Sequence, residues 1–283
     1  MEIQYLSFGN ITVRLELPEA LPTSGRFRDF FGPEKPWDFV LHGSFTDEPI
    51  GLPRNAACRE YARSVLCMEE GGTATYYRAA PGEFYAVKRQ KYGERRASVS
   101  IAESVKGRLW TRLILEMLGI EEIAAQKNGV VFHAAFIEWE GRAVLFTGPS
   151  GIGKSTQAAL WKQFRGTPII NGDKTLLYRE GEKLFASGLP FSGSSAFCEN
   201  RMAALRAIVC LDRCAENAVS PLSPTEALRC LTRSSYILPT CVGSVTQTLI
   251  EIAENAPICS LRCTPDERAV ASLERYLKGS EAT

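Results

Sequence analysis

The sequence predicts a mixed α/β protein of the α+β kind, in which a β-rich N-terminal region precedes a larger region where strands and helices alternate. Residues 11–17 alternate between apolar and polar side chains with a period of two, which is typical of a half-buried strand. After residue 105, apolar runs of strand length alternate with longer amphipathic stretches. Glycine and proline separate the segments, as at 32–33 and 81–82. We therefore expect a division into residues 1–104 and residues 105–283.

Composition sets the class of protein and excludes some partners. The 283 residues suffice for one large domain or two modest ones, and 45% hydrophobic and 23% charged residues are typical of a globular protein. The net charge of +1 provides no broad attraction to nucleic acid or to an anionic membrane, so we expect neither as a partner. The N-terminus lacks the pattern of a secretory signal, and no apolar run approaches the roughly 20 residues of a membrane span. We expect a cytoplasmic protein.

The nine cysteines form no C-x-x-C pair. Cys210 and Cys214 are four residues apart, as are Cys259 and Cys263, and both pairs adjoin apolar runs, where cysteine acts as a small hydrophobic residue. Only two histidines are available as further zinc ligands, so a zinc site is not expected. We expect reduced, mostly buried thiols.

The N-terminal region contains four candidate strands, at residues 11–17, 73–77, 84–87 and 97–101. No catalytic pattern occurs among them, yet residues 1–104 make up more than a third of the chain. We therefore expect this region to recognise a substrate or a partner.

The C-terminal region begins with a predicted helix at 106–127, closed by Gly129. Residues 130–137 and 144–147 read as strands joined by a tight turn at 140–142, and antiparallel pairing is the simplest connection between them. The further elements expected are a hairpin of strands 175–178 and 183–186, a strand at 204–212, helices at 224–233 and 241–254, a strand at 258–263 and a helix at 265–277.

One octapeptide carries the strongest functional signal, because it satisfies the phosphate-loop (P-loop) pattern G-x-x-x-x-G-K-[ST]. Its residues are Gly148, Pro149, Ser150, Gly151, Ile152, Gly153, Lys154 and Ser155. Glycines let successive N–H groups point at phosphate oxygens, and the helix that follows adds its positive N-terminal end. Lys154 can reach the β- and γ-phosphates and the Ser155 hydroxyl can bind Mg²⁺. The sequence therefore predicts ATP and Mg²⁺ as cofactors.

Three features near this loop point to a family. His133 lies on the strand before the hairpin, residues 150–155 read S-G-I-G-K-S, and Gly172 and Asp173 follow Lys154 by 18 and 19 residues. With these residues, the segment from His133 to about residue 180 resembles HPr kinase/phosphorylase and the ATP-dependent phosphoenolpyruvate carboxykinases. Stand-alone HPr-kinase-like proteins, some of which occur with peptide-modification systems, are the most similar group. The resemblance implies a P-loop core carried by a mixed, antiparallel-rich sheet.

The resemblance also implies roles for single residues. Asp173 would take the proton of the acceptor hydroxyl or hold a Mg²⁺-bound water, although Asn-Gly-Asp is also a common turn composition. His133 would face the phosphates, or it is an ordinary core histidine. Thr156 would add a hydroxyl to the phosphate shell or only pack at the helix start. Arg201 would stabilise the transferred phosphoryl group, or pair with Glu199 or Glu216. Ser192, Ser194 and Ser195 would form a substrate or anion loop, or only a flexible Gly-Ser turn.

The chain departs from both families at three positions. Thr156 stands where the HPr kinases have Glu, and Gly172 stands in place of the first of their paired acids. Lys174 replaces the second acid of the carboxykinases. The C-terminal HPr-binding signature is not recognisable, so HPr is not predicted as the substrate.

Three functions remain open from the sequence. The first is a kinase that transfers the γ-phosphoryl group to a hydroxyl of a peptide or protein serine, or of a small molecule. The second is a nucleotide-binding regulatory or switch protein without transfer, which the replaced acid favours. The third is an ordinary P-loop ATPase in which Asp212, 58 residues after Lys154 at the end of a predicted strand, would hold the metal. A homo-oligomer is compatible with each.

Overall fold

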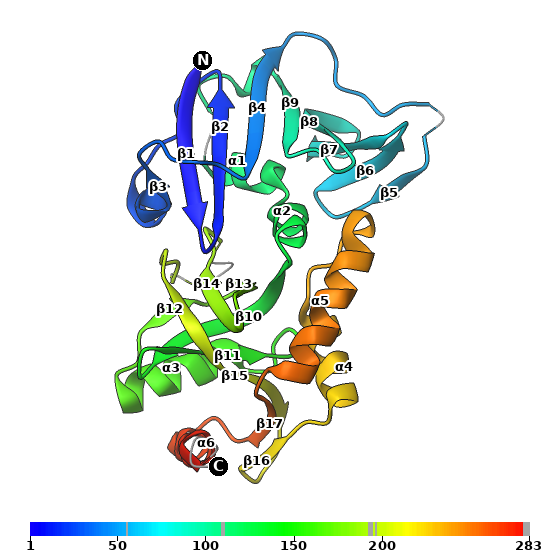
Figure 1. Cartoon of the computed structure of the whole chain (residues 1–283). Helices are drawn as coiled ribbons and strands as arrows, with labels where there is room; N and C mark the ends of the chain where they lie inside the picture. The colour runs from blue at the N-terminus through cyan, green and yellow to red at the C-terminus, as the bar shows by residue number, and fades with distance from the viewer. Residues whose placement is uncertain (55, 109–110, 192–194, 196, 280–283) are drawn as a thin grey trace. The chain divides into compact units, whose positions relative to one another are not determined.

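The structure is a computed structural model that describes residues 1–54, 56–108, 111–191, 195 and 197–279. The chain forms two compact units, one of Met1–Ser7 and Ile11–Ile123 and the other of Phe8–Asn10 and Ala124–Thr283 (Figure 1). The units divide between Ile123 and Ala124, so residue 104, where the sequence suggested a boundary, lies inside the first unit.

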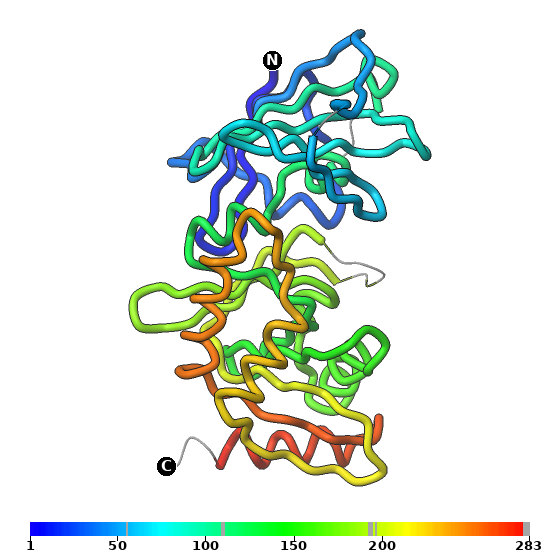
Figure 2. Tube along the Cα trace, turned by 90° about the vertical axis from the view of Figure 1, so that its right-hand side faces the viewer, coloured from blue at the N-terminus to red at the C-terminus, as the bar shows by residue number. Residues whose placement is uncertain are grey.

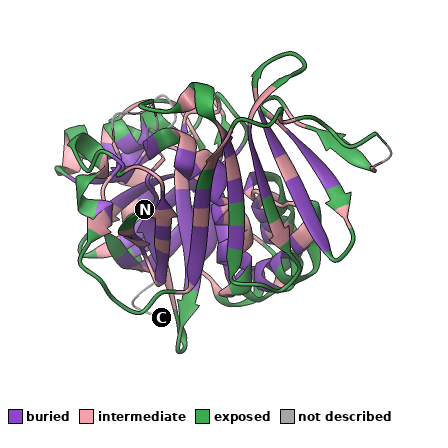
Figure 3. Cartoon of the chain, turned by 90° about the horizontal axis from the view of Figure 1, so that it is seen from above, coloured by how far each residue is buried: buried purple, intermediate pink, exposed green. Residues whose placement is uncertain are grey.

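The first unit is built on a nine-stranded sheet with the order β3-β1-β2-β4-β9-β8-β7-β6-β5. Its strands are β1 (Glu2–Phe8), β2 (Ile11–Leu17), β3 (Phe31–Gly32), β4 (Phe39–Thr46), β5 (Cys58–Glu60), β6 (Ser64–Glu69), β7 (Gly72–Ala80), β8 (Glu83–Lys91) and β9 (Arg96–Ala102). Figure 3 shows buried residues along the central strands of this sheet, whereas β5 is exposed along its whole length. The four strands expected from the sequence are β2, β7, β8 and β9, and all four are confirmed.

The single helix expected at 106–127 is wrong. The described residues of this segment form two helices, α1 (Thr111–Leu118) and α2 (Ile120–Gln126), after a short 3-10 helix at Glu103–Val105. Gly119 separates them with a φ of 70°, a left-handed conformation that no α-helix continues through. A side chain there would also meet the buried ammonium of Lys88, which pairs with Glu122 at 2.9 Å. Apolar periodicity alone does not reveal such a break.

The second unit holds an eight-stranded sheet with the order β11-β10-β13-β14-β15-β17-β16, in which β12 also pairs with β10 and β11 also pairs with β15. The strands are β10 (Gly129–Trp139), β11 (Arg142–Thr147), β12 (Ile169–Asn171), β13 (Lys174–Glu180), β14 (Lys183–Gly188), β15 (Met202–Arg213), β16 (Ala218–Pro221) and β17 (Ile258–Cys263). The helices are α3 (Lys154–Arg165), α4 (Pro224–Ser234), α5 (Val242–Asn255) and α6 (Glu267–Gly279), with a 3-10 turn at Pro239–Cys241. Within the described ranges, no helix combines the length and apolarity needed to cross a membrane.

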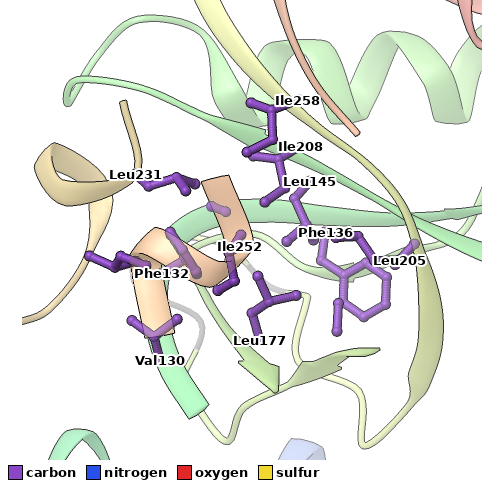
Figure 4. Close-up of a cluster of buried hydrophobic side chains, with 14 of the residues drawn as sticks. Val130, Phe132, Phe136, Leu145, Leu177, Leu205, Ile208, Leu231, Ile252 and Ile258 are labelled. Atoms are coloured by element: carbon purple, nitrogen blue, oxygen red, sulfur yellow. The ribbon is translucent and has the colours of Figure 1, made fainter. Parts of the chain in front are cut away.

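Alternating residues along the central strands bury two faces of this sheet. Ala134 and Phe136 of β10 belong to a cluster that also contains residues of α4 and α5, and Figure 4 shows Leu231 and Ile252 from these helices beside the strand residues. Ala135 and Ile137, between and after them, belong to a second cluster with α3 and α6. Because α5 and α6 contribute to different clusters, α6 (red) lies apart from α5 (orange) in Figures 1 and 2. In β11, which leads into the P-loop, Leu145 belongs to the first cluster and Phe146 to the second, so this strand is also buried on both faces.

The strand pairing around the P-loop is mostly antiparallel. β10 and β11 form the expected hairpin, in which Trp139 pairs with Arg142 across a two-residue turn. Glu140 and Gly141 in this turn have φ values of 50° and 73°, as a type I′ turn requires. Parallel pairing occurs only where β15 runs beside β11 and β17 in the described sheet. The expected antiparallel-rich sheet and antiparallel hairpin are confirmed.

The expectation that all thiols are reduced is wrong for four cysteines. Cys58 and Cys67 lie opposite each other on β5 and β6 and form a disulfide. Cys210 of β15 forms a second disulfide with Cys230 of α4, the helix that covers this part of the sheet. Sequence spacing could not show these neighbours, because sheet register and helix packing create them. The free cysteines are Cys198, Cys214, Cys241, Cys259 and Cys263.

Candidate functional site

The octapeptide forms a loop between a buried strand and a helix. β11 ends at Thr147, and α3 begins at Lys154. Gly148, Gly151 and Gly153 have φ values of 141°, 76° and 121°, which favour glycine over other residues. Gly153 also precedes α3 without a side-chain cap, so the first amides of the helix are not engaged by a capping side chain. The strand, loop and helix that a P-loop needs are therefore present.

Lys154 is folded back across the mouth of the loop. Its Nζ donates to the carbonyl oxygens of Gly148 at 3.0 Å and Pro149 at 3.1 Å, and the residue is only 6% exposed. Burial lowers the pKa of Lys154, whereas the negative charge of Asp173 raises it. The cation is thus held at the loop, within the electrostatic reach of one carboxylate.

Asp173 lies beside His133 because of the register between β10 and β13. His133 is the cross-strand partner of Lys174, and the Ala134 N–H donates to the Asp173 carbonyl at 3.0 Å. The His133 Nε2 lies 3.4 Å from the Asp173 Oδ1, with both side chains partly buried. The hydrogen bond with His133 lowers the pKa of Asp173, and the charges of Lys174 and Lys154 act in the same direction, while burial opposes them. Asp173 is therefore an ionised carboxylate.

The oxygen atoms of this site suit Mg²⁺. Ser155 and Thr156 are exposed in the first turn of α3, and Asp173 supplies an ionised carboxylate. Mg²⁺ prefers oxygen ligands and usually takes one or two protein groups, substrate phosphates and several waters. A hydroxyl from Ser155 and a carboxylate from Asp173 fit this pattern. When bound, the ion would neutralise phosphate charge.

Asn171 fixes the turn that carries Asp173. Its Oδ1 accepts from the N–H groups of Asp173 at 2.9 Å and Lys174 at 3.1 Å, and its Nδ2 donates to the carbonyls of Leu189 at 2.8 Å and Phe191 at 2.7 Å. Asn171 has no exposed surface. This side chain saturates its hydrogen-bonding capacity and ties Asp173 to the segment after β14.

Gly172 is also fixed by its surroundings. A Cβ at this position would overlap the side chain of Ser195. The larger acid that the HPr kinases have here would therefore not fit without moving Ser195. The other two serines of the predicted substrate loop, Ser192 and Ser194, lie outside the described residues.

We expect Asn171→Ala to destabilise the protein by about 1–3 kcal/mol, because it leaves buried N–H and C=O groups without partners. Urea unfolding of the variant measures this loss. Asn255→Ala is the matched control, since Asn255 is exposed and donates a single bond to the Glu251 carbonyl. Equal losses in the two variants would contradict a structural role for Asn171.

The lowered pKa of Asp173 makes its contribution to stability depend on pH. Its folded pKa lies below the ordinary value of 3.8, so the contribution is fully present above that value and is lost as the pH falls through the folded pKa. We expect the difference in unfolding free energy between the native chain and Asp173→Asn to shrink as the pH falls below about 4. Urea titrations over this range measure it. A gap that widens on acidification would contradict the assignment.

Arg201 lies apart from this group. Its guanidinium contacts Glu138 at 2.7 Å and Glu199 at 3.6 Å, and no contact with Lys154 or Asp173 is present among the described residues. The ion pair with Glu199 that the sequence left open is therefore present, and Glu138 is the nearer partner. The geometry provides no support for Arg201 at the transferred phosphoryl group.

Asp212 lies on the other side of the P-loop strand. β15 runs parallel to β11, with Cys210 opposite Thr147, the last residue of β11. Asp212 lies two residues further along β15, next to the start of the P-loop. It is exposed, and its Oδ1 accepts from the Arg213 N–H at 2.8 Å. Asp212 also lines a cavity of about 590 Å³ together with Gly153 and Thr156. Asp173 and Asp212 therefore flank the loop from opposite sides.

Three residues at the site were not singled out from the sequence. Arg213 donates from its guanidinium to the carbonyls of Gly151 and Ile152, which ties the end of β15 to the P-loop. Gln157 lies buried on α3 and lines the same cavity as Asp212. Tyr236 lies 6.3 Å from His133, ring centre to ring centre. Of the three, only Arg213 had a signal in the sequence, because it is a basic residue directly after the strand predicted at 204–212.

Comparisons place the chain among known proteins. The model of the family described as SynChlorMet cassette protein ScmC matches residues 103–275. No curated protein matches the chain. Among solved structures, the Hpr(Ser) kinase/phosphatase from Coxiella burnetii is similar, with 15% sequence identity and a TM-score of 0.34, over 54% of this chain and 94% of that one.

Proposed function

The chain belongs to the ScmC family, and we propose that it is a Mg²⁺-dependent kinase that transfers the γ-phosphoryl group of ATP to a hydroxyl group, on an HPr-kinase-like P-loop core. One observation carries the proposal. The Asp173 carboxylate lies 3.4 Å from the Nε2 of His133, which belongs to the strand paired with the P-loop strand β11, and its negative charge acts on Lys154. A fixed cation and an ionised carboxylate beside a phosphate loop are the groups that phosphoryl transfer to a hydroxyl needs.

Each residue has a distinct task in this reaction. The loop amides and the N-terminal end of α3 bind phosphate oxygens, and Lys154 neutralises charge on the β- and γ-phosphates. Ser155 holds Mg²⁺. Asp173 accepts the proton of the acceptor hydroxyl. The oxygen of that hydroxyl bonds to the γ-phosphorus, while the bond from the γ-phosphorus to the β,γ-bridging oxygen breaks and ADP leaves. His133 fixes the orientation of the Asp173 carboxylate.

The acceptor is a hydroxyl of a serine in a peptide or protein, or of a small molecule. Residues 1–104 belong to the first unit except for Phe8–Asn10, whereas the P-loop belongs to the second, and we assign recognition of the acceptor or of a partner to residues 1–104. The reaction would take place in the cytoplasm.

Incubation of the full chain with γ-labelled ATP, Mg²⁺ and lysate of the source cell tests the proposal. We expect label to leave ATP and to appear on a peptide, protein or small molecule, and to remain on ATP when EDTA is added. Label released only as inorganic phosphate would favour an ATPase. Label that stays on ATP despite nucleotide binding would favour a switch protein.

A second candidate is an ordinary P-loop ATPase that uses Asp212. The position of Asp212 near the end of β15, a strand that runs parallel to and next to β11, favours it. Asp212 is exposed, however, whereas Asp173 is partly buried in contact with His133. For this reason we prefer the kinase.

A further inference from the structure

A cavity of about 590 Å³ adjoins the helix end of the P-loop, within the second unit. It lies between the start of α3 and the segments that follow β15 and β17. Ile152 and Gly153 of the loop and Thr156 of α3 form one side. A volume of this size is typical of small-molecule sites and accommodates a nucleoside.

The lining of the cavity continues the phosphate site. Gly153 and Thr156 belong both to the P-loop region and to the cavity wall, so a nucleotide with its phosphates on the loop can extend its ribose and base into this space. The wall is largely apolar, with side chains of Ile152, Leu211 and Cys263 that suit the faces of a planar base.

Gln157 provides an unpaired hydrogen-bond acceptor in this wall. The residue is only 3% exposed, and its Nε2 donates to the Cys263 Sγ at 3.2 Å. Its Oε1 is buried and has no hydrogen-bond partner among the described residues. Buried amide oxygens are nearly always paired, because leaving one unpaired costs free energy. A ligand that donates a hydrogen bond would satisfy this atom.

The amide of Gln157 can meet such a donor with little rearrangement. The terminal torsion of glutamine has a broad, shallow energy profile, so the amide can turn toward the cavity. The Nε2 already donates to the Cys263 Sγ, so the Oε1 is the amide atom that remains for a ligand.

We propose that this cavity receives the nucleobase and that the Gln157 Oε1 accepts a hydrogen bond from an exocyclic amine, which selects adenine; this inference rests on the proposed function. Adenine carries an amine at C6 and donates there. Hypoxanthine and guanine carry a carbonyl at C6, which would place two acceptors against each other.

Calorimetry on the full chain with Mg²⁺ tests this with four ligands: ATP, purine riboside triphosphate, ITP and inorganic triphosphate. Purine riboside triphosphate differs from ATP only by a hydrogen in place of the C6 amine. We expect ATP to bind about tenfold more tightly than purine riboside triphosphate and ITP, the scale of one buried hydrogen bond. Equal binding of ATP and purine riboside triphosphate, or tighter binding of ITP, would overturn the inference and leave the P-loop assignment intact.

The variant Gln157→Met removes the acceptor at similar side-chain length. We expect ATP affinity to fall to that of purine riboside triphosphate, whose own affinity stays unchanged. Gln247→Met, on the exposed side of α5, is the matched control and should retain the preference for ATP. If none of the four ligands binds the native chain, the P-loop assignment fails, and this inference fails with it.

Discussion

Replacement of Lys154 by alanine is expected to abolish phosphoryl transfer and to weaken MgATP binding by at least about 10²-fold, the scale of two hydrogen bonds to charged groups. The Nζ donates to two carbonyls of the P-loop, so the ammonium lies at the loop that would bind the β- and γ-phosphates. Burial disfavours the charged form of this lysine and lowers its pKa, so phosphate oxygens would replace the hydration that the ammonium has lost. Calorimetric titration with MgATP measures the effect.

The fold of this variant should persist, because the lysine contributes charge to the loop and little apolar packing. Lys162→Ala is the matched control on the same helix. Lys162 lies eight residues after Lys154 on α3, and its ammonium lies 4.7 Å from the centre of the Phe197 ring. MgATP affinity should be unchanged in Lys162→Ala. Unchanged affinity in Lys154→Ala, in a folded protein, would rule out the P-loop as the nucleotide site.

The parts of the site that the sequence predicts well are local in the chain. The P-loop needs only its glycines, the strand before it and the helix after it, and all of these lie within residues 142–165. The hairpin before it follows from a two-residue turn between two apolar runs. The pairing of Asp173 with His133 was accessible only through the family resemblance, because strand register brings these residues together.

The parts that the sequence does not predict depend on long-range contacts. Arg201, directly before β15, pairs with Glu138 of β10, and Gln157 of α3 donates to Cys263 of β17. Neither pairing leaves a trace in periodicity or motif. The disulfide between Cys210 and Cys230 is of the same kind, because the packing of α4 on the sheet decides it. Local patterns therefore identify the phosphate loop, while the acids, amides and cations around it require the three-dimensional arrangement.

Substitution of Asp173 by asparagine is expected to reduce phosphoryl transfer by about 10²-fold or more, the usual scale for a positioned acid–base group, with ATP still bound. The variant keeps the size of the side chain and the backbone turn that Asn171 holds. It removes the charge that accepts the hydroxyl proton and acts on Lys154. Transfer of label from γ-labelled ATP measures the first effect, and calorimetry measures nucleotide binding.

Asp212→Asn is the matched comparison, because Asp212 flanks the same loop from the other side. Its carboxylate is exposed and accepts a bond from the neighbouring Arg213 N–H, so its loss should cost little transfer in the kinase. In an ordinary P-loop ATPase the order reverses, because Asp212 would hold the metal and Asp173 would only shape a turn. The ratio of the two losses therefore separates the candidates within one experiment. A large loss in Asp212→Asn beside a small one in Asp173→Asn would overturn the kinase proposal, even though the P-loop itself would still bind the nucleotide.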